Sequence, residues 1–572
     1  MNEAVQKGRS FWPRGLTTAI DWAVASHARA AALLGLVCCL SFLPGFFQIP
    51  PVDRDEARFA QATKQMVETG DYVDIRFQDE VRYKKPVGIY WLQAAVVKAA
   101  EAAGFAKAPR TIWLYRIPSL IGASGAVLLT YWTALAFATR RAALLAGFLM
   151  AVSILLGVEA RLAKTDAMLL LTVVAAMGAM ARVYLGLGGD PQASRRRWIL
   201  PAIFWSALAG GILIKGPLIL MFVALAAAAL SIHDRSARWL LGLRPLAGVI
   251  GLLVLVLPWF VAILWKSGGA FLVDSVGEDM LSKVAGGRES HGAPPGYYVV
   301  LFFVTFWPGS LLLGLAAPSI WRDKLEKGTR FLLAWAIPSW IVFEIVITKL
   351  PHYVLPLYPA IAILIASRLD PPRLSRHIWL ERGALWWFVA PLVVGLGGIF
   401  LLIVREGSAG ALAWPFAAAA IIFGLRAWWL YGADGPERAA LRAGVASILV
   451  AFAIYGAIFP SLTSVFPSKM IADTLQASDC RDAVAAAAGY HEPSLVFLLG
   501  TDTRLTDAPR AAEFLQGGPC RFALIERSQE RSFAQRAEAI GLRYTPLPRV
   551  QGVNISGGRE VLIGVFRSEG QP

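Results

Sequence analysis

Charged residues are scarce in this sequence of 572 residues: Asp, Glu, Lys and Arg make up 16%, against 56% for hydrophobic residues. Soluble domains carry about 25% charged residues, so this composition excludes an ordinary soluble protein. Apolar runs of about 17–25 residues recur along most of the chain, and each is long enough to cross a hydrocarbon core of about 30 Å. We therefore predict an α-helical polytopic membrane protein.

Cysteine and histidine are also rare, with four and six residues. Cys38 and Cys39 lie in the first apolar run, Cys480 and Cys520 lie near the C-terminus, and their spacing matches no zinc-type site. The first apolar run follows about 30 residues and lacks a persuasive small-residue cleavage site. We expect it to be retained as a membrane span.

Acidic residues are fewer than basic ones, 39 against 55, which gives a formal net charge of +16. A basic balance can indicate a nucleic-acid partner. Here, however, the bases cluster in short loops between the apolar runs, as the positive-inside rule requires of a membrane protein. The charge therefore predicts membrane topology, with no nucleic-acid partner.

The apolar runs predict about thirteen spans. They lie near 31–48, 116–137, 142–158, 166–187, 199–214, 216–232, 246–265, 298–317, 331–348, 352–367, 385–404, 410–430 and 441–462. With the N-terminus in the cytoplasm, the arginine-rich loops all fall inside and the base-poor loops outside. Merging the short pair around Lys215 would break this order, so every unusual polar cluster is predicted to face outside.

The tail changes character after residue 463. Short β-type runs at 494–500, 521–527 and 561–567 alternate with helical stretches such as 468–476 and 531–541. This alternation predicts a small α/β domain. We divide the chain into a membrane domain, 1–463, and a soluble domain, 464–572. An odd number of spans exports the soluble domain to an oxidising compartment, where Cys480 and Cys520 can pair.

The first external loop, 51–110, begins with PVDRDEARFAQATKQMVETG. Its apolar residues recur at helical spacing from Arg54 to Gly70, which predicts an amphipathic helix on the membrane surface. Asp53, Asp55 and Glu56 lie at the start of this helix. Acids there also suit the helix dipole, so helix capping and chemistry are both open interpretations.

Later in the same loop, RYKKPVGIYWLQ places Lys84 and Lys85 before a second surface helix. Adjacent lysines outside the membrane run against the charge rule. They suit either lipid headgroups or a bound phosphate.

Three further external segments are polar. EARLAKTD puts Asp166 at the start of the fourth span, either as a first-turn acid or as a chemical group. The loop 266–297 supplies other candidates, and KLPHYVLPLYP places Lys349 and Tyr353 among prolines. Irregular backbone at membrane depth lines a protein-enclosed cavity. The candidates in the loop are Glu278, Asp279, Arg288 and His291.

Four motifs, in their order along the chain, resemble those of the polyprenyl-phosphate-sugar-dependent glycosyltransferases of the GT-C fold. They are DRDEARFAQATKQMVETGDYV, RYKKPVGIYWLQ, KTDAM and KLPHYVLPLYP. The lipid A aminoarabinose transferases (ArnT-type) are the nearer branch and the protein O-mannosyltransferases the more distant one. The resemblance covers the membrane domain and is weaker over the tail. It implies a bacterial inner-membrane enzyme that moves a sugar from an undecaprenyl-phosphate-like donor to lipid A or another envelope acceptor in the periplasm.

The resemblance also implies roles for single residues. Asp55 corresponds to the catalytic acid of the first loop, with Glu56 beside it, and Asp166 to the acid of the second external loop. Lys85 corresponds to a lysine that contacts the carrier phosphate, and Tyr353 to the tyrosine of a Leu-Pro-X-Tyr motif. The candidates for binding substrate or phosphate are Lys84, Lys85, Tyr353, Lys349, Arg288 and Arg58.

Lys84 departs from the pattern of the aminoarabinose transferases, which usually carry glutamate there. That glutamate has been linked to a metal site, so a divalent metal stays open and no cofactor is required. The candidate ligands are His291, Glu278 and Asp279. A second base also repels a cationic aminosugar, which predicts a neutral or acidic donor.

Two other functions fit parts of the sequence. A transporter or flippase of lipid-linked sugars is less favoured, because the notable charges lie at one surface and no repeated halves are visible. A protein O-mannosyltransferase-like enzyme that acts on Ser or Thr is the second alternative.

Overall fold

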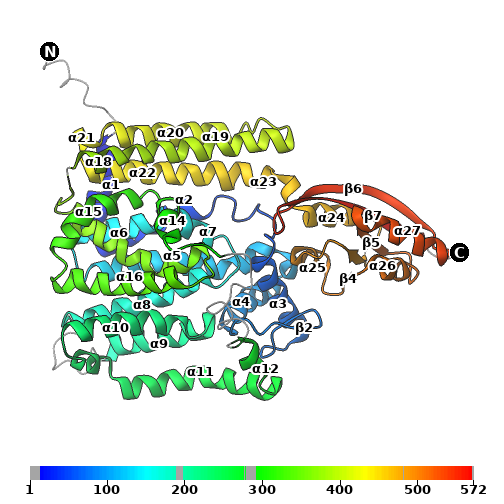
Figure 1. The fold of residues 1–572 in the computed structure, drawn as a ribbon, viewed down its shortest axis with the longest axis horizontal. Helices are drawn as coiled ribbons and strands as arrows, with labels where there is room; N and C mark the ends of the chain where they lie inside the picture. The colour runs from blue at the N-terminus through cyan, green and yellow to red at the C-terminus, as the bar shows by residue number, and fades with distance from the viewer. Residues whose placement is uncertain are drawn as a thin grey trace, which may run out of the picture.

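The computed structural model describes residues 13–187, 198–275, 277, 292–375, 377–480 and 482–569. Figure 1 shows long helices side by side in a bundle, with the C-terminal domain at one end of that bundle. The main helices of the bundle are α1 (Pro13–Val24), α2 (His27–Phe42), α5 (Ile112–Ala134), α6 (Arg140–Ala151), α7 (Ile154–Glu159), α8 (Asp166–Tyr184), α9 (Ile199–Lys215), α10 (Leu218–His233), α11 (Pro245–Ser267), α14 (Tyr297–Thr305), α15 (Ser310–Arg322), α16 (Lys327–Ile345), η5 (Pro351–Leu357), α17 (Tyr358–Leu369), α19 (Trp386–Glu406), α20 (Ala413–Trp429) and α22 (Pro436–Ala451).

Each predicted span coincides with one helix or with two or three consecutive helices, and α9 and α10 are separate, as predicted. Within the described ranges, six helices are long and apolar enough to cross a membrane. A seventh span results if α14 and α15, which are bent by 118° relative to each other, count as one. The helical, multi-span prediction is confirmed; the count of thirteen and the orientation of the chain stay predictions.

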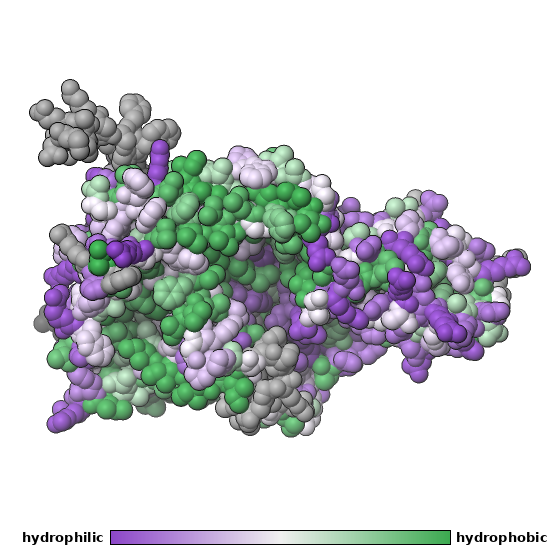
Figure 2. All heavy atoms as spheres, turned by 45° about the horizontal axis from the view of Figure 1, so that its top comes forward, coloured by the Kyte–Doolittle hydropathy of each residue, from purple (hydrophilic) through white to green (hydrophobic). Residues whose placement is uncertain are grey.

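The sides of the bundle are apolar. In Figure 2, green side chains cover the bundle between its hydrophilic left edge and the hydrophilic C-terminal domain. On α11, Val254 and Trp265 are 66% and 89% exposed. Apolar surface of this extent is unstable in water and suits contact with lipid.

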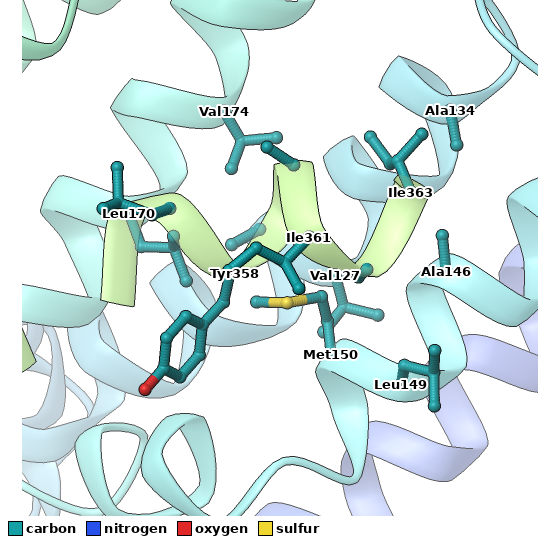
Figure 3. Close-up of a cluster of buried hydrophobic side chains, with 14 of the residues drawn as sticks. Val127, Ala134, Ala146, Leu149, Met150, Leu170, Val174, Tyr358, Ile361 and Ile363 are labelled. Carbon is teal, nitrogen blue, oxygen red and sulfur yellow. The ribbon is translucent and has the colours of Figure 1, made fainter. Parts of the chain in front are cut away.

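Helix α17 lies at the centre of the bundle and is buried on nearly all sides, as expected of a helix that is apolar all round. Figure 3 shows Ile361 and Ile363 of α17 among Val127 of α5, Met150 of α6 and Leu170 of α8. Because neighbouring helices hold α17 in place, they also fix the irregular turn η5 that precedes it.

The segment predicted to be the first external loop folds into α3 (Asp55–Thr69), the short strands β1 (Arg76–Phe77) and β2 (Glu80–Val81), and α4 (Gly88–Ala102). They lie between the bundle and the C-terminal domain (Figure 1). Helix α3 confirms the predicted helix, and Gly70 ends it in the left-handed conformation. At the start of α4, Gly88 packs so closely on the backbone of Leu213 that a Cβ would lie 2.7 Å from its carbonyl oxygen.

The C-terminal domain is an α/β sandwich with strand order β4-β3-β5-β7-β6. β3 pairs in parallel with β4 and β5, and β7 is antiparallel to β5 and β6. Alternate alanines of β3 pack toward two separate hydrophobic clusters, one on each face of the sheet, which follows from the two-residue period of a strand. Its elements are α24 (Pro467–Gln476), β3 (Val484–Ala488), α25 (Pro493–Leu499), β4 (Arg504–Thr506), α26 (Ala508–Leu515), β5 (Arg521–Glu526), α27 (Glu530–Ala539), β6 (Tyr544–Asn554) and β7 (Arg559–Ser568).

The α/β prediction for this domain is confirmed, but the prediction of a β run at 494–500 is wrong. The segment forms α25, because Pro493 suits the first position of a helix and Gly500 follows its end. A short apolar run has no periodicity that separates strand from helix. Cys480 and Cys520, whose pairing the sequence left open, form a disulfide.

Candidate active site

Five titratable side chains meet where α7, α8, α9 and η5 come together, and we call them the Asp166 cluster. One carboxylate oxygen of Asp166 is 2.5 Å from Lys215 Nζ and 3.7 Å from His352 Nε2, and the other is 3.6 Å from Lys164 Nζ. Glu159 Oε1 lies 3.0 Å from Lys164 Nζ and 4.0 Å from His352 Nδ1. The cluster therefore joins two acids to two lysines and a histidine.

The local sequence explains why these residues face one another. Asp166 is the first residue of α8, where the helix dipole favours an acid, and Lys215 is the last residue of α9, where it favours a base. Gly216, with φ of 69°, and Pro217 end α9 at that point. Pro351 and Pro356 keep η5 from forming a regular α-helix, and this turn carries His352.

Tyr353 borders the cluster. Lys215 Nζ lies 5.7 Å from the centre of its ring, a distance typical of a cation–π contact. The ring also packs edge-on against His352 and at a tilt against Phe343. The structure thus brings two predicted site residues, Asp166 and Tyr353, around one lysine.

Asp55 is exposed at the first residue of α3. Its negative charge acts on Lys164, as do the charges of Glu159 and Asp166. It also acts on the hydroxyl of the buried Tyr90. The charges of Asp55 and Asp166, two of the three acids predicted to be catalytic, therefore act on the same lysine.

Glu56 has a different environment, which we call the Glu56 clamp. Oε1 accepts hydrogen bonds from Arg116 Nε (2.7 Å) and Ala163 N (2.9 Å), and Oε2 accepts from Arg116 Nη2 (2.8 Å) and Val52 N (2.8 Å). Arg116 is fully buried. It also donates to three carbonyl groups of the segment between α2 and α3, those of Phe46, Ile49 and Pro50. The clamp ties α3 to the turn that leads to Lys164.

The predicted phosphate-binding residues do not all lie in the same part of the structure. Lys85, partly exposed, lies in the turn before α4, and the contact of Gly88 with Leu213 places this turn near the end of α9 that carries Lys215. Lys84, beside it, is exposed. Arg58 is partly exposed and its charge acts on Asp53.

Lys349 turns away from the Asp166 cluster. Its Nζ donates to the carbonyl oxygens of Phe343, Glu344 and Val346, at 3.3, 2.9 and 2.7 Å. It therefore caps the C-terminal end of α16, where a cation suits the helix dipole. Four other candidates, Arg288, His291, Glu278 and Asp279, lie outside the described residues.

The structure offers one group with the spacing of metal ligands among the residues it describes. One ligand atom each from Glu159, Asp166 and His352 lies within 4.8 Å of the others. The ammonium groups of Lys164 and Lys215, however, already face both carboxylates. A divalent cation here would meet two positive charges at short range, so these residues do not fit a metal site.

Asp53 links the site to the C-terminal domain. Its Oδ1 accepts a hydrogen bond of 2.9 Å from Ser494 N, in the first turn of α25. Burial raises the pKa of Asp53 to about 6. Glu492 adds to this rise, whereas the bond to Ser494 and the charge of Arg58 oppose it.

Sequence reasoning did not assign Glu159, Lys164, Lys215 or His352 to the site. The lysines did give a signal, since they are isolated bases in regions predicted to face outside, where bases are few. At membrane depth, an isolated ionisable residue marks a functional site by default.

Comparison with known proteins relates this chain to several glycosyltransferases. A family model described as dolichyl-phosphate-mannose-protein mannosyltransferase matches residues 56–271, less than half of the chain. That range begins in α3 and includes Lys85, Asp166 and Lys215.

Curated relatives are similar over a longer range. An undecaprenyl phosphate-alpha-4-amino-4-deoxy-L-arabinose arabinosyl transferase of Enterobacter sp. (strain 638) is 26% identical over 354 residues, 60% of this chain and 61% of that protein. Its counterpart in Pectobacterium carotovorum subsp. carotovorum (strain PC1) is 27% identical over 413 residues, 68% of this chain and 71% of that protein. The alignment with the first relative thus spans about three fifths of its length.

Among solved structures, ArnT from Cupriavidus metallidurans in the apo state superposes with a TM-score of 0.71 and 18% identity, and covers 94% of this chain and 98% of that chain. The chain has the ArnT fold. ArnT from the same organism bound to undecaprenyl phosphate gives a TM-score of 0.69 and 19% identity over 94% of this chain and 97% of that chain. The predicted GT-C fold is confirmed.

Proposed function

We propose that this protein is a membrane glycosyltransferase that moves a sugar from a polyprenyl-phosphate donor to an acceptor of the bacterial envelope. The observation that carries this proposal is the convergence of Asp55, Asp166 and Lys215 with Tyr353 at one end of an ArnT-type bundle. Relatives named for undecaprenyl-phosphate-linked arabinose support the donor class.

The reaction breaks the bond between the anomeric carbon and the phosphate oxygen of the donor. That oxygen and its electron pair stay on the lipid phosphate, so the leaving group needs positive charge rather than a proton. Lys85, Lys215 and the Tyr353 hydroxyl suit this task. Lysines serve here because their compact ammonium groups sit on flexible stems and can turn toward a phosphate.

The acceptor oxygen forms the new bond to the anomeric carbon, and a hydroxyl acceptor must lose its proton. Asp55 suits the role of base because it is exposed at the end of a helix. Asp166 forms an ion pair of 2.5 Å with Lys215, so its carboxylate is already engaged by a cation. We assign Asp166 to holding the two lysines toward the donor phosphate, and Glu56 to holding the backbone of Asp55.

We further propose that the donor sugar is neutral or acidic. Lys84 stands beside the phosphate-binding Lys85 and repels a cationic aminosugar. The proposed acceptor is lipid A, as the resemblance of the sequence motifs to the aminoarabinose transferases implies. The family model named for protein mannosyl transfer favours a second candidate, a Ser or Thr hydroxyl of an exported protein.

The test is transfer by the purified protein in lipid nanodiscs from undecaprenyl-phosphate-linked sugars of neutral, acidic and cationic type. Lipid A and a Ser/Thr-rich peptide are offered as acceptors. Asp55→Asn should lower kcat by about 10²–10⁴-fold, the usual contribution of a positioned base. Asp473→Asn, on the exposed side of α24, is the matched control and should transfer like wild type.

Two results would refute the proposal. One is transfer by Asp55→Asn at the wild-type rate. The other is an absence of transfer to every acceptor, combined with an unchanged mass spectrum of lipid A, envelope polysaccharides and exported proteins in a deletion strain. Loss of a single sugar mass in that strain would identify the donor and the acceptor class.

A further inference from the structure

Arg54, directly before Asp55, has an unusual backbone conformation. Its φ is 67° and its ψ is −102°, and it is one of four non-glycine residues with positive φ in the described part of the chain. Side chains other than glycine rarely adopt such angles. A strained residue persists only where its surroundings hold it, and such residues are concentrated at functional sites.

The surroundings that hold this turn belong to the C-terminal domain. Arg54 Nη2 donates a hydrogen bond of 2.6 Å to the carbonyl oxygen of Ser556, between β6 and β7. Asp53 Oδ1 accepts one of 2.9 Å from Ser494 N in α25. The partners are 502 and 441 residues away along the chain.

The two loops that hold the turn are themselves joined by Glu492. Its carboxylate accepts hydrogen bonds from Asn554 Nδ2 (2.7 Å) and from Ser556 Oγ (3.1 Å). Because Glu492 lies two residues before Ser494, two groups move as one unit. They are the Ser494 amide that donates to Asp53 and the Ser556 carbonyl that accepts from Arg54.

The same domain is also attached along the rest of α3. Gln61 Nε2 donates to Thr501 Oγ1 at 2.8 Å, and Lys64 Nζ donates to the carbonyl oxygen of Phe497 at 3.2 Å. Thr501 Oγ1 donates to Glu68 at 2.6 Å. The axis of α3 is thus fixed on the C-terminal domain, while the Glu56 clamp fixes its first turn on the bundle.

We infer that the C-terminal domain positions the active site: by holding Asp53 and Arg54, it maintains the strained turn that sets the position of Asp55 at the start of α3. This inference rests on the proposed function, because it assigns a role in the same reaction. Asp53 and Arg54 are positioning residues, and they act on catalysis only through Asp55.

The first test is Arg54→Ala, which removes both the tether to Ser556 and the side chain that imposes the turn. Displacing a catalytic group by about 1 Å can lower the rate by about 10²-fold. We expect a loss of that order in kcat with the donor KM unchanged, because the phosphate-binding lysines are on other segments. Arg54→Lys keeps one donor for the Ser556 carbonyl and should recover part of the rate.

The matched control is Arg405→Ala. Arg405 is exposed, like Arg54, and also joins the bundle to the C-terminal domain, through an ion pair of 3.0 Å with Glu560 of β7, but this pair is far from the turn in sequence. It should retain the wild-type kcat and KM.

The second test compares Asp53→Ala with Asp53→Asn. Asparagine keeps an acceptor oxygen for Ser494 N, so Asp53→Asn should stay active at pH 7 while Asp53→Ala loses kcat. This pair serves as the decisive comparison if Arg54→Ala fails to fold.

The outcomes separate this inference from the proposed function. Wild-type kcat in both Arg54→Ala and Asp53→Ala, with an inactive Asp55→Asn, would overturn the inference and leave the function intact. Equal losses in Arg54→Ala and Arg405→Ala would also overturn it, because the effect would then be general detachment of the domain. Full activity in Asp55→Asn would instead refute the function.

Discussion

The Glu56 clamp and the Asp166 cluster are both buried networks of charge, yet they differ in how completely their bonds are made. In the clamp, each oxygen of Glu56 accepts two hydrogen bonds of 2.7–2.9 Å. In the cluster, Glu159 Oε2 is buried and meets no hydrogen-bond donor among the described residues.

This difference shows what each network does. A fully satisfied buried network rigidifies a structure, whereas each unsatisfied buried group calls for an explanation. The base in the clamp is an arginine, whose planar fork suits a permanent two-point bond to a carboxylate. The bases in the cluster are lysines, which can exchange one anionic partner for another. Both networks are buried and charged. The hydrogen-bonding capacity that Glu159 Oε2 leaves unused is therefore what distinguishes the Asp166 cluster from the clamp.

The largest effect should come from breaking the clamp. Arg116→Met leaves the Glu56 carboxylate buried without its cation, and breaking a buried pair in this way costs about 3–5 kcal/mol. We expect a large fall in the melting temperature of the purified protein in detergent, with loss of activity as a consequence. Arg405→Met, in an exposed pair, should cost at most about 1 kcal/mol. Equal melting temperatures in the two variants would contradict the assignment of the clamp to stability.

Breaking the cluster should lower activity and leave the fold intact. Lys215→Met removes a charge that stabilises the leaving phosphate, and losing one such preorganised group typically lowers kcat by about 10²–10³-fold. The measurement is transfer at saturating donor, together with the melting temperature. A fall in melting temperature with an unchanged kcat would mean that Lys215 is structural, like Arg116.

The turn at Asp53 should give a pH-dependent effect on stability. Its pKa in the folded protein, about 6, lies above the ordinary value of 3.8. Asp53 therefore contributes fully to the stability of the folded wild type below about pH 4, and this contribution is lost as the pH rises through 6. Asp53→Asn stays neutral, so its melting temperature relative to wild type should increase between pH 4.5 and pH 7.5, by the equivalent of about 1 kcal/mol. A difference that does not vary with pH would contradict the raised pKa.

The smallest effect should come from Lys349. Its three bonds to carbonyl groups at the end of α16 give it a capping role, worth about 1 kcal/mol at most. Lys349→Met should lower the melting temperature slightly and leave the donor KM unchanged. A several-fold rise in the donor KM would instead place Lys349 in the phosphate site and remove the contrast with Lys215.

Much of the fold follows from the sequence because its signals are local. Apolar runs mark the helices, and Gly70 marks the end of α3. Three short motifs predicted Asp55, Asp166 and Tyr353 as site residues. Each of these predictions depends on residues within one segment.

What the sequence did not predict depends on packing between distant segments. Lys215 meets Asp166 because α9 packs on α8, and His352 reaches Lys164 across 188 residues because α17 is fixed in the core. Lys349 points away from the site because the last carbonyl groups of α16 are nearby. The strained turn at Arg54 is imposed by a domain more than 400 residues away.

The most direct test of the central proposal, that the lysines around Asp166 receive the donor phosphate, is an electron-density map of the protein with bound undecaprenyl phosphate. We expect a phosphate oxygen within ion-pair distance, about 4 Å, of the Lys85 nitrogen and another within that distance of a lysine nitrogen of the Asp166 cluster. A phosphate bound at the opposite end of the bundle, or one that lies near Lys85 but out of reach of Lys164 and Lys215, would contradict the proposal.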